Sequence, residues 1–526
     1  MKLRMINKNI LLIILIIFLC FAVNINPAEA KYGDSLLVGM PVSPVTLDPA
    51  VAVDEESEQI ISNIYETLVE INPALNQVMP NLAVNWYSDS SYTQWVFVLR
   101  EGVYFTDGTS FNAESVRFSF LRQMDAKSMY HFPKYGYYSY YAAAFNGFPG
   151  IISKINVIDK HKIEFIFTKP VPNLLEILSL PQFSIVSPKA VKTHKDNFRA
   201  NPVGTGPYKL ASWNYNSRLT LEKNNKYWKK TPLAGKIIVQ AISNHSYRLS
   251  LLEKDNLDIV VGAEIRDYYK FKAANKYKLI QYPYPFDIML GINCAKPVFK
   301  ELKVRRAIRS IMSKDIIDRL YVFELPKKKV NYKQIFYALK KTNSNYIKAY
   351  RTLKETKYNK KYELEFICRE GFPLYANETD LIPEKIKFLL KECGFGVKLK
   401  ILSQDKFNQA LIKGEYDVAL LYTYLKNKDE SLFYAVYFDQ FYPAKYGLNK
   451  FHCYSRDLKR IMRDIQGINT NYNERYALEE MNYYIEENIP YVFLSRLGSS
   501  VICPENIKGL RFDNNNCIRF DKIYLK

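Results

Sequence analysis

The sequence predicts an α/β protein with more than one lobe. Its 526 residues exceed what a single hydrophobic core usually supports. In the second half of the chain, short apolar runs of strand length alternate with longer segments whose apolar residues recur at helical spacing. This alternation predicts strands at 362–368, 395–402 and 416–422, with helices at 382–393 and 405–413 between them. A β-α-β-α-β order implies a parallel sheet with right-handed crossovers.

The N-terminal segment has the pattern of a secretory signal. Lys2, Arg4 and Lys8 precede the apolar run Ile10–Val23, and the small-residue site Ala28–Ala30 follows. A basic start, a short apolar core and an A-x-A site predict cleavage after Ala30 and export of the rest. The alternative is a retained anchor helix, although fourteen apolar residues are short for a membrane span.

The formal net charge of the chain is +21 at pH 7. An excess of this size is typical of proteins with polyanionic partners, such as nucleic acid or a cell-wall polymer. The basic residues are dispersed, however, and Lys327–Lys329 is a rare run among them. Without a basic stripe or a base-stacking module, we expect no nucleic-acid partner. Binding to a surface or cell-wall polyanion stays open as an alternative function.

The cysteines and histidines indicate neither a metal centre nor a cofactor. No C-x-x-C motif occurs, and the five histidines are scattered along the chain. Six cysteines follow the leader, and an exported chain can oxidise them. Cys503 and Cys517 flank a segment that could form a hairpin or a return loop, and they are our preferred pair for a disulfide. Motifs of hydrolases, phosphate-binding loops and zinc proteases are absent from the sequence, so we expect no enzyme.

The stretch Asn201–Trp228 has a residue pattern that predicts its local structure. Its first residues, NPVGTGPY, combine prolines that fix φ with glycines that permit positive φ, which predicts a defined loop. Two short runs of β-forming residues follow, separated by the polar turn Asn214–Ser217. This pattern predicts a hairpin. An aromatic pair, Tyr227 and Trp228, closes the stretch.

These motifs resemble those of a known family. GTGPY followed by Trp213 and the Tyr227-Trp228 pair is similar to the signature of the family 5 extracellular solute-binding proteins, the oligopeptide, dipeptide and nickel receptors of ABC importers. The block Pro80–Phe120 and the TLDP segment at 46–49 resemble two further patterns of that family.

The resemblance implies a fold and a function. The fold is a periplasmic-binding-protein-like bilobal fold (type II, cluster C-like) with an extra N-terminal α+β subdomain. The implied division is a signal peptide at 1–30, lobe I at 31–75, 200–289 and 496–526, the subdomain at 76–199 packed on lobe I, and lobe II at 290–495. The chain would cross between the lobes twice and close about these crossings on a solute.

The implied function is capture of a peptide or peptide-like solute in the periplasm and its delivery to an ABC permease in the inner membrane. We expect a monomer. A receptor that presents its solute to a sensor instead of a permease is a further alternative.

The candidate ligand-binding residues follow from the resemblance and from the ends of the predicted parallel strands, where ligands of open α/β sheets bind. They are backbone groups of Val42, Ser43 and Val45, and the side chains of Trp213, Arg369, Tyr422, Tyr424, Leu425 and Asp429. Many peptide receptors of this family have an Asp that pairs with the α-amine of the ligand, and the matching place in this chain is near Leu425. The chain has an apolar residue there, with Asp429 as the nearest acid. Either Asp429 substitutes for it, or the solute lacks a free amine.

Two other groups of residues have a structural interpretation. Asp54, Glu55, Glu56 and Glu58 lie at the start of a helix predicted at 56–69, where negative charge suits the helix dipole. Contact with a charged ligand is the alternative. The tyrosine-rich segment 123–150 is interpreted as packing on the subdomain, with a role in lining a pocket as the alternative.

Overall fold

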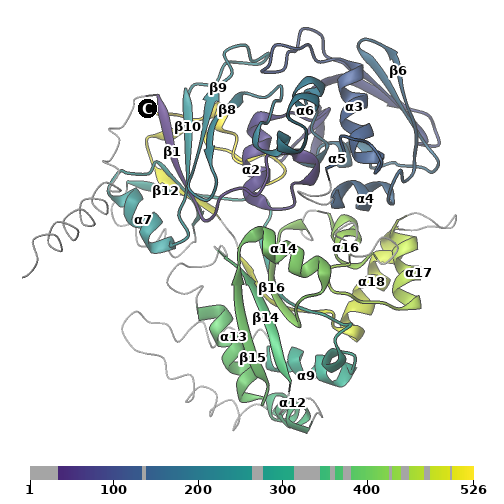
Figure 1. Cartoon of the computed structure of the whole chain (residues 1–526), viewed down its shortest axis with the longest axis vertical. Coiled ribbons are helices and arrows are strands. Elements are labelled where there is room, and N and C mark those ends of the chain that lie inside the picture. Colours follow the sequence, from purple (N-terminus) through teal and green to yellow (C-terminus); the bar gives the residue numbers. More distant parts are fainter. Residues whose placement is uncertain are drawn as a thin grey trace, which may run out of the picture.

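The computed structural model shows two lobes, one above the other in the view of Figure 1. It describes residues 34–132, 138–263, 276–312, 344–355, 362–370, 381–425, 429–439, 449–466, 474–497 and 500–525. The predicted signal peptide at 1–30 therefore lies outside the described residues. Among the described residues, no helix is both long and apolar enough to cross a membrane.

Lobe I is built on a seven-stranded mixed sheet. Its strands in spatial order are β12 (Tyr277–Gln281), β18 (Ser500–Pro504), β11 (Ile259–Ala263), β1 (Ser35–Met40), β10 (Lys236–Ala241), β9 (Arg218–Lys223) and β8 (Tyr208–Asn214). β1 pairs in parallel with β10 and β11, whereas β18 runs antiparallel to β11 and β12. Helices α2 (Glu55–Ile64) and α7 (His245–Glu253) belong to this lobe, as does the short C-terminal pair β19 (Ile507–Lys508) and β20 (Tyr524–Leu525).

The predicted hairpin is confirmed by the antiparallel pairing of β8 and β9. The loop before it needs its glycines, because a Cβ at Gly204 would lie 2.2 Å from the carbonyl oxygen of Ile64, and one at Gly206 would lie 2.6 Å from the same atom. At this close approach the Gly206 N–H donates to the Ile64 carbonyl at 2.9 Å. The loop therefore holds the end of α2 by its backbone.

The buried carboxylate of Glu66 explains the spacing of the same motif. It accepts hydrogen bonds from the Thr205 hydroxyl at 2.8 Å, the Tyr227 hydroxyl at 2.9 Å and the Trp228 indole N–H at 2.6 Å. Lys229 lies 3.6 Å from it. A buried charge needs several such donors, so the loop and the aromatic pair both converge on the residue just after α2.

The extra subdomain contains a four-stranded antiparallel sheet. Its order is β4 (Ala83–Ser88), β5 (Gln94–Leu99), β7 (Lys162–Phe167) and β6 (Ile152–Asp159), with the hairpin β2 (Val69–Asn72) and β3 (Gln77–Pro80) beside it. Helices α3 (Ala113–Met124), α4 (Ser139–Phe145), α5 (Leu174–Leu178) and α6 (Pro188–His194) complete it. The Asn146 side chain, just after α4, donates to the carbonyl of Gln466 in lobe II at 3.3 Å. The subdomain thus contacts both lobes.

Lobe II is built on a five-stranded sheet in the order β15 (Gly396–Leu402), β14 (Glu363–Arg369), β16 (Val418–Thr423), β13 (Phe286–Ile292) and β17 (Tyr491–Leu497). Its helices are α9 (Leu302–Ile311), α12 (Ser344–Glu355), α13 (Leu381–Glu392), α14 (Gln404–Lys413), α16 (Glu430–Phe438), α17 (Arg456–Ile465) and α18 (Glu474–Asn488). β14 pairs in parallel with both β15 and β16, which confirms the parallel β-α-β-α-β unit.

The chain passes between the two large sheets twice, from β12 to β13 and from β17 to β18. The predicted lobe boundaries at 289/290 and 495/496 fall inside β13 and β17, so both boundaries need correction. All of β13 is buried in the lobe II sheet. The first crossing is therefore at 282–285, and the second follows Leu497. The predicted boundary at 75/76 lies in the turn between β2 and β3, which pair with each other.

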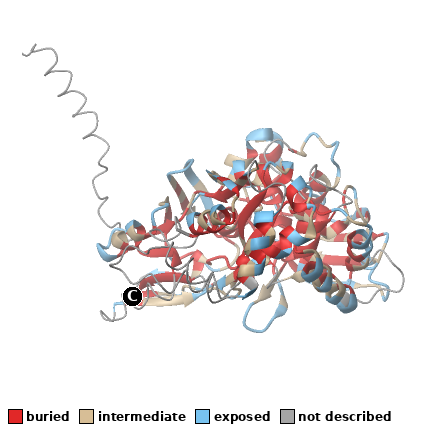
Figure 2. Cartoon of the chain, turned by 90° about the horizontal axis from the view of Figure 1, so that it is seen from below, coloured by how far each residue is buried: buried red, intermediate tan, exposed pale blue. Residues whose placement is uncertain are grey.

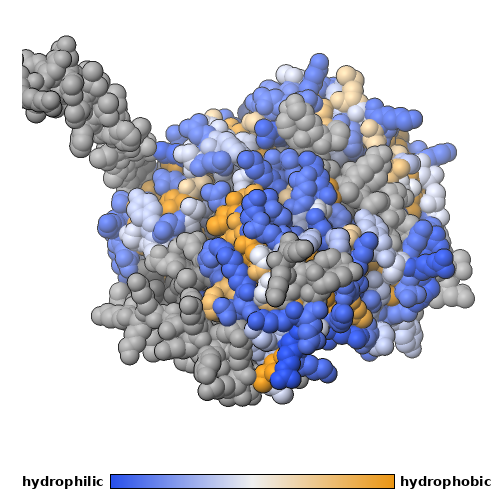
Figure 3. Space-filling view, turned by 60° about the horizontal axis from the view of Figure 1, so that its bottom comes forward, coloured by the Kyte–Doolittle hydropathy of each residue, from blue (hydrophilic) through white to orange (hydrophobic). Residues whose placement is uncertain are grey.

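Buried residues follow the sheets and the helices packed on them (Figure 2). On the face seen in Figure 3 the surface is mainly hydrophilic, with apolar residues in small separate groups.

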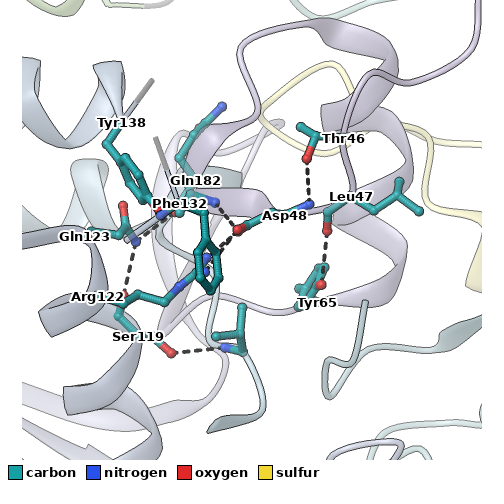
Figure 4. A network of polar contacts seen from close by, with 12 residues as sticks. Thr46, Leu47, Asp48, Tyr65, Ser119, Arg122, Gln123, Phe132, Tyr138 and Gln182 are labelled. Carbon is teal, nitrogen blue, oxygen red and sulfur yellow. Dashed lines mark hydrogen bonds and ion pairs between the residues drawn. The ribbon is translucent and has the colours of Figure 1, made fainter. Parts of the chain in front are cut away.

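A buried ion pair joins the TLDP segment to the subdomain (Figure 4). The Arg122 guanidinium on α3 donates to both carboxylate oxygens of Asp48, one of them at 3.0 Å, and the two side chains are 1% and 3% exposed. Asp48 also accepts from the Ala50 N–H at 3.1 Å and so caps the short 3-10 helix Pro49–Val51. The Tyr65 hydroxyl donates to the Leu47 carbonyl at 3.0 Å. The segment that leads into α2 is thereby fixed from two sides.

We predict that Arg122→Met destabilises the protein by about 3–5 kcal/mol, because it leaves the Asp48 carboxylate buried without its counter-ion. The measurement is urea unfolding followed by circular dichroism. Arg117→Met on the same helix is the matched control, since that side chain is 44% exposed in its pair with Glu114 and its loss should cost less than about 0.5 kcal/mol. Equal losses in the two variants would contradict the role of the buried pair.

Candidate functional site

Two adjoining cavities lie between the lobes, where the first turn of α2 faces the ends of β14 and β16. Both are lined by Glu55, Glu58 and Tyr422. The first cavity is lined further by Val53, Asp54, Tyr140, Arg369, Gln404, Phe407, Asn408, Leu411, Leu420, Leu421, Thr423, Tyr424, Leu425, Val436, Tyr437 and Lys450. The second is lined further by Met40, Pro41, Glu56, Gln59, Val261, Gly262, Tyr282, Phe286, Asn515, Asn516 and Cys517.

The topology of lobe II explains why its polar residues meet here. β14 and β16 are parallel neighbours, so their carboxyl ends lie at the same edge of the sheet. This edge brings Arg369 at the end of β14 beside Tyr422 near the end of β16. The Arg369 guanidinium donates to the Tyr422 hydroxyl and lies 4.5 Å from the centre of the Tyr422 ring.

A buried ion pair crosses from this edge to lobe I. Arg369 donates to the two carboxylate oxygens of Glu56 at 2.9 Å and 3.4 Å, and the two side chains are 4% and 6% exposed. Gln404, at the start of α14, accepts a further hydrogen bond from the same guanidinium. The pair links α2 of lobe I directly to the sheet of lobe II, so it holds the lobes in the closed arrangement.

A second link between the lobes centres on Glu58, two residues after Glu56 in α2. Its carboxylate accepts from the Tyr424 hydroxyl of lobe II at 2.8 Å. From the subdomain it accepts from the Gln182 amide at 2.6 Å and from the Tyr140 hydroxyl at 3.5 Å. One carboxylate of lobe I thus accepts hydrogen bonds from both lobe II and the subdomain.

The electrostatics of the cleft are dominated by carboxylates. Burial, with the neighbouring charge of Glu56, raises the pKa of Asp54 to about 7 and raises the pKa of Glu55 well above its usual range. Burial lowers the pKa of Lys450 to about 8. The two cavities are lined by four carboxylates, those of Asp54, Glu55, Glu56 and Glu58. Two basic side chains, Arg369 and Lys450, line the first cavity as well.

Four of the predicted ligand-binding residues come together in the first cavity: Arg369, Tyr422, Tyr424 and Leu425. The structure holds all of the described cysteines as thiols, so the pairing of Cys503 with Cys517 stays a prediction. Cys503 is buried on β18, whereas Cys517 lines the second cavity and its thiol lies 3.4 Å from the carbonyl of Asn515.

Asp429 caps a helix in this structure. It is the N-cap of α16, where its carboxylate accepts from the Leu432 N–H at 2.8 Å, and it is absent from the lining of both cavities. The helix start already uses this carboxylate, and the role of Asp429 as an amine acceptor stays a prediction.

The predicted residues Val42, Ser43, Val45 and Trp213 are absent from the lining of both cavities, although the neighbouring Met40 and Pro41 line the second one. The Val45 N–H donates a hydrogen bond to the Ser57 hydroxyl at 3.0 Å, so it is not available for pairing with a ligand backbone. The Trp213 indole N–H donates to the Ser43 hydroxyl at 3.3 Å, which ties β8 to this segment. The structure assigns Val42 no place in the cavity lining.

The acids of α2 are the main feature that the sequence prediction undervalued. The signal was present, since four acids within five residues are more than a helix dipole requires. The tyrosine-rich segment has both of its proposed roles. Tyr140 lines the first cavity, whereas Tyr141 is fully buried and donates to the carbonyl of Pro149 at 2.8 Å.

A scan against protein families matches residues 77–442, more than half of the chain, to the bacterial extracellular solute-binding proteins, family 5. The chain belongs to this family. The resemblance predicted from its motifs is thereby confirmed, and so is the two-lobed α/β fold, which solved structures of family 5 binding proteins share.

The relatives bind different solutes. The dipeptide-binding protein of Escherichia coli is 28% identical over 48% of this chain and 49% of its own length. The heme-binding protein A of Haemophilus influenzae is 26% identical over 56% of each chain. The chain spans about half the length of these curated relatives in the matches. A solved structure of the periplasmic binding protein DppA from Helicobacter pylori with the peptide STSA superposes with a TM-score of 0.79, 24% identity, and coverage of 94% and 98%.

We predict that Arg369→Met opens the lobes of the solute-free protein. It leaves Glu56 without its guanidinium in the closed state, which should shift the closure equilibrium by about 3 kcal/mol, or more than a hundredfold. Small-angle X-ray scattering would report a larger radius of gyration. Arg309→Met in the exposed pair with Glu486 is the control, and an unchanged radius in Arg369→Met would contradict the prediction.

We predict further that closure of the empty cleft depends on pH through Asp54, whose neighbours are Glu55, Glu56 and Arg369. Because burial raises its pKa to about 7, protonated Asp54 favours the closed state fully below about pH 4, and this contribution is lost as the pH rises through 7. Scattering from pH 5.5 to 8 should show progressive opening of the wild type. Asp54→Asn keeps a good helix cap and should respond less to pH; an equal response would contradict the assignment.

Proposed function

We propose that this chain is the periplasmic solute-binding component of an ABC importer. It captures a peptide or peptide-like solute between its lobes and delivers it to a permease of the inner membrane. The observation that carries the proposal is that each wall of the cleft comes from a different lobe. A solute held by both walls favours the closed state, and closure changes the surface that a membrane partner contacts.

Family membership supports this function. Relatives with dipeptide- and glutathione-binding names match about half of the chain. The alternative of a surface polyanion-binding protein has only the net charge of +21 in its favour. No reaction is assigned to the chain, and delivery requires none.

We infer that the solute carries an amino or guanidino group that binds beside Glu55. This carboxylate lines both cavities and is partly exposed, and its pKa is raised by burial and by the charge of Glu56. A cation placed there would relieve the repulsion among the carboxylates of α2. Two tyrosines border the same space: Tyr422, whose ring face is in contact with the Arg369 guanidinium, and Tyr424, through its hydroxyl.

This inference bears on the missing acid near Leu425. The acceptor for an ammonium group would lie on lobe I, in α2, in place of an acid after β16 in lobe II. A free-amine peptide is then compatible with the chain although Asp429 caps a helix. Because the cation favours the ionised carboxylates, its binding would release protons, and its affinity would rise with pH through the pKa of Asp54.

The test begins with native mass spectrometry of the purified protein to see which solute co-purifies. A panel of dipeptides with free amines and the same dipeptides with acetylated amines is then compared by thermal shift. Free-amine dipeptides should raise Tm, and their acetylated forms should not. Absence of any solute in the protein, together with no shift in the panel, would contradict the proposed function.

Glu55→Gln tests the residue. It should weaken binding of an amine-bearing solute about tenfold or more by calorimetry, because a charge-assisted hydrogen bond contributes about 1.5–3 kcal/mol. Glu114→Gln is the matched control, since Glu114 also lies in the first turn of a helix, α3, and is exposed outside the cleft. Equal affinities of Glu55→Gln and wild type would remove Glu55 from the site and leave the capture of solute intact.

A further inference from the structure

Two cysteines that are 159 positions apart in the sequence are neighbours in lobe II. Cys294 follows β13, and Cys453 lies in the segment 449–455 that leads into α17. The Cys294 N–H donates to the carbonyl of Phe451 at 3.0 Å, which places the two short segments side by side. The Cys453 thiol donates to the same Phe451 carbonyl at 3.7 Å, and the Cys294 thiol donates to the carbonyl of Ile292 at 3.7 Å, so both thiols lie at this contact between the two segments.

The segment that carries Cys453 is held in place by its own hydrogen bonds. The Asn449 side chain accepts from the Cys453 N–H at 3.1 Å and donates to the Cys453 carbonyl at 3.0 Å. The His452 ring is hydrogen-bonded to the carbonyl of Leu411 at 2.7 Å. The pairing of the two thiols is thus a property of a fixed segment, and a bond between them would add little ordering cost.

The surroundings differ between the two sulfur atoms. Cys294 is partly exposed, whereas Cys453 is 3% exposed. The neighbouring Cys453 thiol, together with the charge of Arg305, lowers the pKa of Cys294, although burial acts against this. Burial and the neighbouring Cys294 thiol raise the pKa of Cys453 well above its usual range. Cys294 is therefore the thiol that ionises first and is reached first by a reagent from solution.

We propose that Cys294 and Cys453 form a disulfide bond in the exported protein. The oxidant is a disulfide of the periplasmic thiol–disulfide oxidoreductase class. The Cys294 thiolate attacks one sulfur of that disulfide and forms a mixed disulfide, with release of one thiol. The Cys453 sulfur then loses its proton to solvent and displaces the second thiol. Two cysteine thiols are oxidised to one disulfide, and one disulfide is reduced to two thiols.

The bond would join the end of β13 to the entry of α17. It closes a long loop that includes β14, β15 and β16, so it restricts the unfolded chain across most of lobe II. This inference goes beyond the proposed function and does not depend on which solute is bound. The structure holds these cysteines as thiols, and the backbone contact between Cys294 and Phe451 is the observation that favours this pair over Cys503 and Cys517.

The test uses the full chain exported to a bacterial periplasm. The protein is denatured in acid with an alkylating reagent, digested without reduction and mapped by mass spectrometry. A pair of peptides joined through Cys294 and Cys453, two mass units lighter than their sum, is expected. Recovery of both cysteines in alkylated form, or a different pairing of either, would overturn the proposal.

Thermal unfolding separates the bond from mere packing of the thiols. Dithiothreitol should lower the Tm of the wild type by about 3 °C. It should leave the Tm of Cys294→Ser unchanged, and the variant should match the reduced wild type. Cys503→Ser is the control and should keep the response to dithiothreitol. A wild type whose Tm does not respond to the reductant would count against the bond, whether or not the protein binds solute.

Discussion

The closed arrangement of this protein depends on the burial of the acidic first turn of α2 between the lobes. Carboxylates lose much of their hydration there, so the molecule must supply donors and counter-charge. Arg369 and Tyr424 of lobe II supply part of this, to Glu56 and Glu58, and Gln182 of the subdomain supplies another part. Asp54 and Glu55 keep a raised pKa, which shows that the compensation is incomplete. An incompletely compensated cluster is suited to a protein whose closure is to be favoured by a bound cation.

Contacts outside the cleft hold α2 in place at both of its ends. Before the helix, the buried pair of Asp48 and Arg122 fixes the incoming segment to the subdomain. After the helix, Glu66 gathers Thr205, Tyr227 and Trp228, and the glycine loop contacts the last carbonyl of the helix. These contacts are distant from the cleft, yet they determine where its acidic wall stands. A substitution in the family motif would therefore be expected to act on the site through the position of α2.

Several elements could be predicted because their signals are local. The hairpin at 208–223 needs only strand formers and a polar turn, and the β-α-β-α-β unit needs only alternating periods of two and 3.6. The strand ends of that unit correctly placed Arg369 and Tyr422 in the cleft. Asp429 could not be placed in this way, because an acid after a strand fits a ligand contact and a helix cap equally well. Cap geometry depends on where α16 begins, and that is a property of packing.

The sequence by itself determined the family, the α/β class and the pairing of neighbouring elements, since these rest on residue spacings within a few tens of positions. Only the tertiary structure decided what the acids of α2 do. A helix start in solvent accepts negative charge without further help, whereas the same residues under lobe II require a partner 313 positions away. The tertiary structure also decided which cysteines lie close together, because this depends on the packing of distant segments and not on their order in the chain.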